Sequence, residues 1–411
     1  MSEWKKVRLG ELCDFINGGA WSDKEYAPEG IPVLKVTNCK NSGFSLSELS
    51  YLPHSLEQKY IQNKLQRNDV IIATVGSHPN LVNSSAGRSV IVNSFVEGFY
   101  LNQNAVCIRT KDEEILDQLF WGYYSKYYLF QNYIQMRGKG AANQMRIAIS
   151  AIKNYPMPLP PINVQRHIAS ILSRYDSLIE NYQKQIKLLE EAAQRLYKEW
   201  FIDLHFPGHE NTKIVDGVPE GWERKKVGEI GTVITGKTPS TSNKENYGGS
   251  IPFITIPDMH TGIYPVSSVF LSEKGAESQS KKYIPQGALI VSCIGTAGLV
   301  CITKERCQTN QQINSLILDD KEMLHYMYFV FLSLKEHLNN IGSNGATMTN
   351  VNKSKFEGID IVVPSSCIIR DFSQRTTPYF ENIKSLQSQL RLLTEARDRL
   401  LPKLMSGEIE I

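Results

Sequence analysis

The sequence lacks the features that mark membrane, secreted and metal-binding proteins. No apolar run approaches the roughly 18 residues that a membrane-spanning helix needs, and the polar start Met1-Ser2-Glu3-Trp4-Lys5-Lys6 is not a secretory signal. The seven cysteines are an odd number and include no Cys-x-x-Cys pair, so neither a disulfide framework nor a zinc site is indicated. We therefore expect a cytoplasmic protein that holds no metal.

The chain also has little net charge. It contains 45 Lys and Arg against 42 Asp and Glu, which leaves a formal charge of +3. A protein that binds nucleic acid alone usually has a larger basic excess, so nucleic-acid binding by this chain would need help from partner proteins. Hydrophobic residues make up 41% of the 411 residues, which is enough for the cores of several domains.

Complete catalytic motifs are missing as well. The single Pro-Pro pair, Pro160-Pro161, lacks the flanking polar and aromatic residues with which an adenine-N6 methyltransferase holds a flipped base. Pro257-Asp258 is not followed by the acid-x-lysine of a metal-dependent nuclease, and neither Gly-x-Ser-x-Gly nor His-Glu-x-x-His occurs. The chain is therefore expected not to be an enzyme.

Gly231–Thr238 is the one exception, because it satisfies the phosphate-loop pattern G-x-x-x-x-G-K-[ST] in full. That loop works only between a buried strand and a helix, whose N-terminus holds the phosphates. Here the charged stretch Trp222–Val227 precedes the motif, and the turn-like stretch Pro239–Lys244 follows it. A phosphate-loop ATPase is therefore an alternative that the flanking residues disfavour.

Two stretches, offset by 204 residues, carry unbroken heptad seams. Steps of four and three residues place each seam on one stripe of a helix, which is the pattern of long helices that pair. The first seam is Ile168, Leu172, Tyr175, Ile179, Tyr182, Ile186, Leu189, Ala193, Leu196 and Trp200, and the second is Phe372, Thr376, Tyr379, Ile383, Leu386, Leu390, Leu393, Arg397, Leu400 and Leu404. Asn163 is the expected N-cap of the first helix. The seams alone would also suit a coiled-coil structural adaptor, which is a second alternative.

The seams belong to a duplicated unit. Leu188-Leu189-x-Glu191-Ala192-x-x-Arg195-Leu196 returns as Leu392-Leu393-x-Glu395-Ala396-x-x-Arg399-Leu400. Upstream, Asp69–Gly76 and Ala288–Gly295 both have the pattern of a buried strand that enters a glycine turn. Asn102-Gln103-Asn104 recurs as Asn310-Gln311-Gln312. Repeats of this length indicate that one unit was duplicated.

The duplication predicts an α+β protein with two mixed α/β globular domains and two long coiled-coil helices. A whole domain separates the helices in sequence, and two-fold pairing of a duplicated unit favours an antiparallel, pseudo-two-fold symmetric arrangement. The expected order is a domain at residues 1–160, a helix at 161–206, a linker at 207–221, a domain at 222–364 and a helix at 365–411.

This order and several motifs resemble the specificity subunits of type I restriction-modification enzymes. The resemblance rests on Thr235–Ser240, Tyr247–Ile254, Ser292–Thr296, Thr309–Gln312 and Gly342–Ala346, and on Pro158–Pro161 leading into Gln165-Arg166-x-Ile168-Ala169. It covers essentially the whole chain. The sequence departs from the family at Asp371-Phe372-Ser373, where a Gln-x-x-Ile-Ala helix entry is usual, and at Arg397 on the seam.

The resemblance implies a non-catalytic, sequence-specific DNA-binding subunit. Each globular domain would be a target-recognition domain that reads one half of a bipartite double-stranded DNA target, while the helices would set the gap and dock methyltransferase subunits. Two methyltransferase subunits would use S-adenosylmethionine, and two restriction subunits would use ATP and Mg²⁺ in the full complex. No cofactor is expected on this chain itself.

Amide, hydroxyl, acidic and basic side chains in loops are the candidate base contacts, because they supply paired hydrogen-bond donors and acceptors. In the first domain the candidates are Thr37, Asn38, Lys40, Ser77, His78, Asn80, Arg88, Arg137, Lys139, Asn143, Gln144 and Arg146. In the second domain they are Lys237, Thr238, Ser240, Thr241, Asn243, Lys244, Asp258, Ser343, Asn344, Thr347, Thr349, Asn350 and Lys353.

Overall fold

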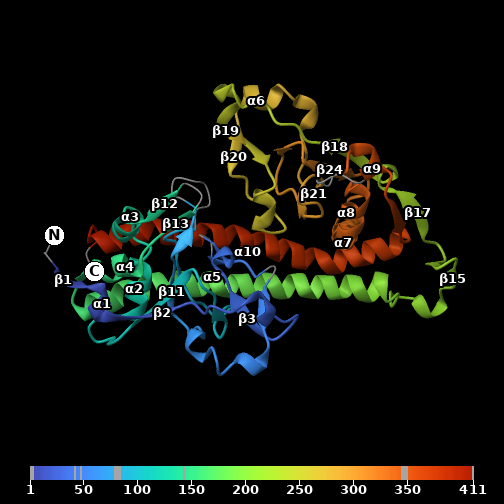
Figure 1. The fold of residues 1–411 in the computed structure, drawn as a ribbon. Helices are drawn as coiled ribbons and strands as arrows, with labels where there is room; N and C mark the ends of the chain where they lie inside the picture. Colours follow the sequence, from blue (N-terminus) through green and yellow to red (C-terminus); the bar gives the residue numbers. More distant parts are fainter. Residues whose placement is uncertain are drawn as a thin grey trace. The chain divides into compact units, whose positions relative to one another are not determined.

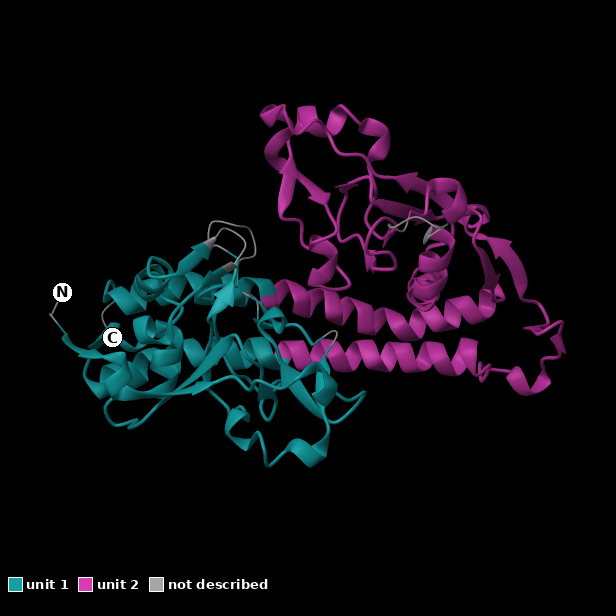
Figure 2. Ribbon diagram, in the orientation of Figure 1, with its two compact units in different colours: residues 1–181, 391–411 teal, residues 182–390 magenta. Residues whose placement is uncertain are grey.

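A computed structural model describes residues 4–40, 43–46, 49–77, 85–141, 144–343 and 350–409. The chain divides into two compact units (Figures 1 and 2). Unit 1 contains residues 1–181 and 391–411, and unit 2 contains residues 182–390. Each unit therefore combines one globular domain with one part of each long helix.

Unit 1 is built on a four-stranded antiparallel sheet. In spatial order its strands are β2 (Cys13–Asn17), β11 (Ala105–Thr110), β7 (Val70–Ala73) and β9 (Ser89–Ile91). Both faces of β7 are buried, because all four of its residues are apolar. One face packs against the aromatic side chains of α2 (Gln118–Tyr124) and α3 (Tyr128–Gln135), such as Trp121 and Phe130.

Smaller sheets complete unit 1. The first consists of β10 (Tyr100–Leu101), β3 (Ile31–Leu34) and β6 (Ser50–Leu52), and the second of β12 (Lys139–Ala141), β13 (Gln144–Arg146) and β8 (Val75–Gly76). A third pairs β1 (Lys5–Arg8) with β14 (Pro156–Leu159), and β4 (Cys39–Lys40) pairs with β5 (Gly43–Phe44). The short helices α1 (Leu9–Leu12) and α4 (Ile149–Lys153) lie between these strands in sequence.

Unit 2 repeats this plan. Its four-stranded antiparallel sheet contains β18 (Gly231–Thr235), β24 (Ile313–Leu318), β21 (Leu289–Ser292) and β22 (Val300–Ile302) in spatial order. Its other sheets are β20 (Val269–Leu271), β19 (Tyr247–Ile254) and β23 (Gln308–Thr309), the pair β17 (Glu223–Lys226) and β25 (Asp360–Val363), and the linker hairpin β15 (Ile214–Val215) and β16 (Val218–Pro219). Its shorter helices are α6 (Glu273–Glu277), α7 (Leu324–Ser333), α8 (Lys335–Ser343) and α9 (Lys353–Glu357). The matching strand order confirms the predicted duplication.

The structure rules against a phosphate loop at Gly231–Thr238. The first five residues form strand β18, which pairs antiparallel with β24. The backbone N–H of Lys237 donates to the carbonyl of Thr309 at 3.0 Å, so it is used by the fold. The next helical segment is only the 3-10 turn Lys244–Asn246. The motif therefore lacks the helix N-terminus that would hold phosphates.

The two long helices are α5 (Ile162–Tyr197), which continues as a π-helical turn at Lys198–Ile202, and α10 (Ser366–Ser406). In unit 1 the start of α5 shares a core with the end of α10, through Leu172 and Leu404. In unit 2 the end of α5 meets the start of α10, where the rings of Trp200 and Phe372 lie 5.8 Å apart. The helices are therefore antiparallel in both units. In the described part of the chain, neither they nor any other helix is long and apolar enough to cross a membrane.

The predicted N-cap at Asn163 is wrong. Helix α5 begins at Ile162, because the carbonyl of Pro161 already accepts hydrogen bonds from the N–H groups of Val164 and Gln165. The buried side chain of Gln165 then fixes this helix start to the domain. Its Nε2 donates to the carbonyls of Pro160 and Ile115, and its Oε1 accepts from the N–H of Asp117.

Every residue of the two predicted seams is buried or half-buried, including the polar ones. Arg397 of α10 donates to Asp176 of α5 (Nη1 to Oδ1, 2.6 Å), and Asp176 accepts a second hydrogen bond from the hydroxyl of Tyr123 on α2 (2.7 Å). The hydroxyl oxygen of Thr376 forms a hydrogen bond with Nδ1 of His325 on α7, at 2.9 Å. The departures from an apolar seam therefore join α10 to α5 in unit 1, through Arg397, and α10 to the globular domain in unit 2, through Thr376.

Candidate nucleic-acid interface

One end of the four-stranded sheet is built in the same way in both units. In unit 1, backbone hydrogen bonds run from Gly18 N to Ala105 O (3.0 Å), from Gly19 N to Leu101 O (2.8 Å) and from Thr74 N to Asn104 O (2.8 Å). In unit 2, they run from Gly236 N to Ile313 O (3.0 Å), from Lys237 N to Thr309 O (3.0 Å) and from Cys293 N to Gln312 O (2.8 Å). We call this end the turn edge, made of residues 18–20, 74–77 and 102–104 in unit 1 and 236–238, 293–296 and 310–312 in unit 2.

Glycine is required where the first strand leaves the sheet. A Cβ on Gly18 would lie 1.9 Å from the carbonyl oxygen of Asn102, and one on Gly236 would lie 2.1 Å from that of Asn310. These obstacles are backbone atoms of a neighbouring turn, so they cannot move aside as a flexible side chain would. The glycine of the phosphate-loop pattern therefore serves close backbone packing.

In unit 2 the turn edge carries exposed polar side chains. Lys237, Thr296 and Gln311 are exposed. The hydroxyl of Thr238 donates to Oε1 of Gln311 at 2.5 Å, which fixes the orientation of this amide. The exposed Asn350 lies beside the edge, because it forms a β-bridge with Ile294. Together these groups offer a cation, an oriented amide and a second exposed amide, which suit phosphates and base edges.

In unit 1 the turn edge exposes Gln103 and Asn104, and the β12–β13 hairpin continues it, because β13 pairs with β8. Lys139 and Arg146 are exposed and stand directly opposite each other in that hairpin. Directly opposed like charges destabilise a hairpin, so this pair is suited to an anion such as a phosphate. Arg137, just before the hairpin, stacks on the ring of Tyr133 at 3.5 Å.

Three predicted DNA contacts are used by the fold instead, and we remove them from the interface. Asn38 is buried, and its amide bonds to the N–H of Lys35 and the carbonyl of Ser45. Asp258 is 3% exposed, and its carboxylate accepts from Thr255 and from the N–H of Ser268. Arg88 is half-buried and donates to the carbonyl of Cys39 at 2.5 Å. Loop composition could not separate such turn-forming groups from exposed ones.

The other candidates lie in several places. Thr37 and Lys40 are exposed beside Asn38, and Ser240, Thr241, Asn243 and Lys244 are exposed in the loop that follows the turn edge of unit 2. Ser77 is half-buried at the turn edge of unit 1, and Lys353 forms an ion pair with Glu357 at 3.4 Å. His78, Asn80, Asn143, Asn344, Thr347 and Thr349 lie outside the described residues, as do the side chains of Gln144 and Ser343.

Sequence reasoning missed Gln103, Asn104, Gln311 and Gln312, although the Asn-Gln repeat was the available signal. It also missed Lys24, which, like Lys244, lies in a 3-10 turn that follows the turn edge. Each lysine precedes a glutamate that another lysine neutralises. The hydrogen bond from Lys59 lowers the pKa of Glu25 to about 2, and the hydrogen bond from Lys274 lowers the pKa of Glu245. Lys24 is exposed in unit 1, and Lys244 is exposed in unit 2.

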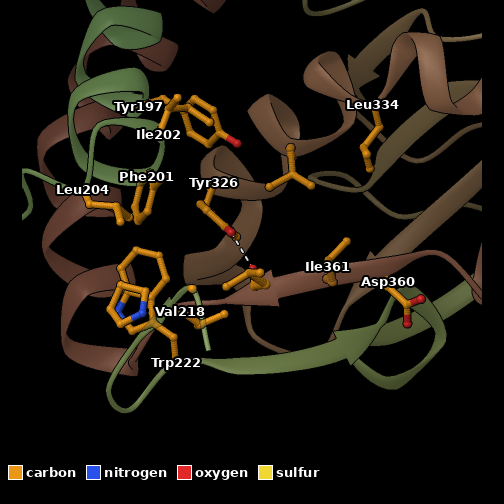
Figure 3. A pocket seen from close by; sticks show the side chains of 14 residues that line it. Tyr197, Phe201, Ile202, Leu204, Val218, Trp222, Tyr326, Leu334, Asp360 and Ile361 are labelled. Carbon is orange, nitrogen blue, oxygen red and sulfur yellow. Dashed lines mark hydrogen bonds between the residues drawn. The ribbon is translucent and has the colours of Figure 1, made fainter. Parts of the chain in front are cut away.

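A cavity of about 250 Å³ lies elsewhere in unit 2, between the end of α5, the linker hairpin and β25 (Figure 3). Its walls include the aromatic rings of Tyr197, Phe201, Trp222 and Tyr326. The hydroxyl of Tyr326 donates a hydrogen bond to the carbonyl of Val362. Asp360 is the only carboxylate among the lining residues, so the cavity offers an apolar surface and no pair of groups for acid–base catalysis.

Comparison with known proteins places the whole chain among DNA specificity proteins. The family model described as "Type I restriction modification DNA specificity domain" matches residues 1–191 and 219–374. The HindI type I restriction enzyme specificity subunit of Haemophilus influenzae is 28% identical, and the similarity covers 100% of both chains. The MjaIX specificity subunit of Methanocaldococcus jannaschii is 30% identical over 64% of this chain and 62% of its own length.

The fold has a counterpart among solved structures. The S subunit of a type I restriction-modification system from M. genitalium aligns with a TM-score of 0.59 and 19% identity. The alignment covers 98% of this chain and 96% of that chain. At this level of identity, the comparison supports the shared fold.

Proposed function

Because the chain belongs to the family of type I restriction-modification DNA specificity domains, we propose that it selects the DNA target of a methyltransferase complex. Each globular domain reads one half of a bipartite double-stranded sequence, and the helices set the gap between the halves. The chain contributes recognition, while partner subunits supply methyl transfer with S-adenosylmethionine and cleavage with ATP and Mg²⁺. Those partners surround the duplex and neutralise many phosphates, which accounts for a net charge of only +3.

The observation that carries this proposal is the repeated turn edge. Two domains of one chain carry an exposed amide on the same backbone frame, Gln103 and Gln311. Each domain also has an exposed lysine, Lys24 or Lys244, in the 3-10 turn that follows the turn edge. Exposed side chains are not needed for folding, so their repetition favours a shared ligand. Two equivalent sites in one chain suit a target with two separate halves.

The adenine methylation pattern tests the proposal. We expect cells that express this chain with its methyltransferase partner to carry N6-methyladenine in one bipartite motif with a fixed gap. One adenine should be methylated in each half, on opposite strands. A genome-wide methylation map measures this directly, and a single contiguous motif would contradict two independent readers.

We further propose that two methyltransferase subunits dock, one on each copy of an exposed helix stripe. The stripe is Leu188, Ala192 and Arg195 on α5 in unit 2, and Leu392, Ala396 and Arg399 on α10 in unit 1. Leu188 is 64% exposed and Leu392 is 55% exposed. Each stripe is flanked by an equivalent ion pair, Lys187 with Glu191 and Arg391 with Glu395. A repeated exposed leucine suits the same partner bound twice.

Single and double substitutions of the stripe test its role in docking. We expect Leu188→Glu and Leu392→Glu each to remove one methyltransferase subunit from the complex, and the double variant to remove both, because a buried carboxylate would replace an apolar contact. Native mass spectrometry of the co-expressed complex counts the subunits. Leu178→Glu is the matched control, since Leu178 is exposed but its repeat equivalent is Asn382. Full occupancy in the double variant would place docking elsewhere.

A further inference from the structure

The two turn edges belong to one chain, but they have to read half-sites of different sequence. The side chains that they share and those that differ therefore point to two kinds of DNA contact, one with the backbone and one with bases. A side chain that both units keep is suited to features that both half-sites share, and the phosphates and sugars are the features that every sequence shares. A side chain that one unit alone carries is free to serve a particular base. This comparison rests on the proposed function.

The shared set consists of exposed side chains at the turn edge and in the 3-10 turn that follows it. Gln103 and Gln311 occupy the same position of the Asn-Gln turn, held by equivalent hydrogen bonds to the glycine turn. Lys24 is the second residue of the 3-10 turn after the turn edge of unit 1, and Lys244 is the first residue of the 3-10 turn after that of unit 2. In unit 1 that turn reaches the Asn-Gln turn, because Asn102 donates to the hydroxyl of Tyr26. In unit 2 hydrogen bonds from Asn246 to the carbonyl of Ser240 and from Tyr247 to the carbonyl of Pro239 tie it to the loop that directly follows the turn edge.

The side chains that differ between the units lie directly after the glycine that the turn edge requires, Gly18 in unit 1 and Gly236 in unit 2. Unit 2 has an exposed Lys237, whose equivalent in unit 1 is Gly19. A side chain at Gly19 would collide with the buried indole of Trp21, since a Cβ there would lie 2.1 Å from the ring. Thr238, which orients Gln311, is replaced by Ala20 in unit 1. The residues directly after the required glycine therefore present a cation and an oriented amide in unit 2. In unit 1 the same positions carry no charge and lie against the indole of Trp21.

We propose that Lys24, Lys244, Gln103 and Gln311 hold the phosphodiester backbone in the same way in both half-sites, and that Lys237 reads a base in only one of them. A lysine ammonium donates hydrogen bonds without accepting any, so it selects a base edge that carries acceptors. Guanine presents two adjacent acceptors, N7 and O6, in the major groove. The half-site of unit 2 therefore contains a guanine that Lys237 contacts. The neighbouring Gln311 contacts the phosphodiester backbone of the DNA.

The backbone contacts are tested by binding measurements on the complex with its methyltransferase partner. We expect Lys244→Ala and Lys24→Ala to weaken binding to the target duplex and to a scrambled duplex by the same factor. Each should lower the slope of log affinity against log salt by about 1, because one phosphate contact is lost. None of Lys24→Ala, Lys244→Ala and Gln311→Ala should change the methylated motif. Lys213→Ala, an exposed lysine of the linker, is the control for the loss of one positive charge.

The base contact is tested by the methylation map of Lys237→Gly, which places the residue of unit 1 in unit 2. We expect one guanine position of one half-site to become degenerate, while the other half-site and the gap stay unchanged. Affinity for the target should fall about 5- to 150-fold relative to the scrambled duplex. An unchanged thermal unfolding midpoint and retained partner binding establish that the variant folds.

Different outcomes overturn different claims. Equal losses on target and scrambled duplexes for Lys237→Gly, or a motif unchanged by it, overturn its assignment as a base reader. A base position altered by Lys24→Ala, Lys244→Ala or Gln311→Ala overturns the backbone assignment, as does a salt slope that does not change in the lysine variants. If the unaltered complex fails to bind DNA or to methylate a bipartite motif, the proposed function fails, which is a separate result.

Discussion

A methyltransferase complex whose specificity chain has one extra heptad in each long helix will methylate a motif whose gap is longer by about three base pairs. Seven residues add about 10 Å to a helix at about 1.5 Å per residue, and base pairs are spaced by about 3.4 Å. The insertions belong after Lys184 in α5 and after Ser388 in α10, which are equivalent positions of the repeat. A whole heptad preserves both seams, so the antiparallel pairing persists.

A five-residue insertion at the same two positions is the matched control. It adds about 7 Å, but it rotates the helix beyond it by about 140°, because each residue turns the helix by about 100°. It also breaks the heptad phase of both seams. We expect the heptad variant to retain methylation at the new gap and the five-residue variant to lose it. Methylation at the original gap in either variant would mean that the helices act as a flexible tether.

Exchange of one globular domain will replace one half-site completely and leave the other intact. Residues 1–160 form their own sheets and most of a core that the ends of α5 and α10 complete, so the equivalent domain of a relative carries its own turn edge. The methylation map of the chimera should show a new sequence in one half and the original sequence in the other. A simultaneous change of both halves would mean that the domains do not read independently.

The contacts of unit 1 with its helices define how this exchange must be made. The donor domain needs a tyrosine in place of Tyr123, because its hydroxyl bonds to Asp176, the partner of Arg397. It also needs backbone equivalent to Ile115–Asp117, which holds the side chain of Gln165. A donor that lacks both contacts is the negative control, since it leaves a partly buried ion pair and a buried amide with fewer partners. The reciprocal exchange of residues 222–364 should change only the other half-site.

The sequence by itself determined the duplication, the two long helices and the buried strands that enter glycine turns. These features follow from local periodicity: the seam from Ile168 to Trp200 faces inward because steps of four and three keep one stripe of a helix on one side. Val70–Ala73 and Leu289–Ser292 form central strands because consecutive apolar residues bury both faces of a sheet. Each signal is contained in a short window of sequence.

Only the tertiary structure decided which polar residues are available and which the fold uses. Asn38 and Asp258 have the composition of loop contacts, but they bond to backbone within their own turns. Arg397 interrupts the seam, and its partner Asp176 lies in the other helix. The turn edge joins Gly236 to Ile313 and Cys293 to Gln312, so the exposed position of Gln311 depends on strands that are distant in sequence. Local pattern fixes which elements form, whereas burial and hydrogen bonding between distant segments fix which side chains can reach a ligand.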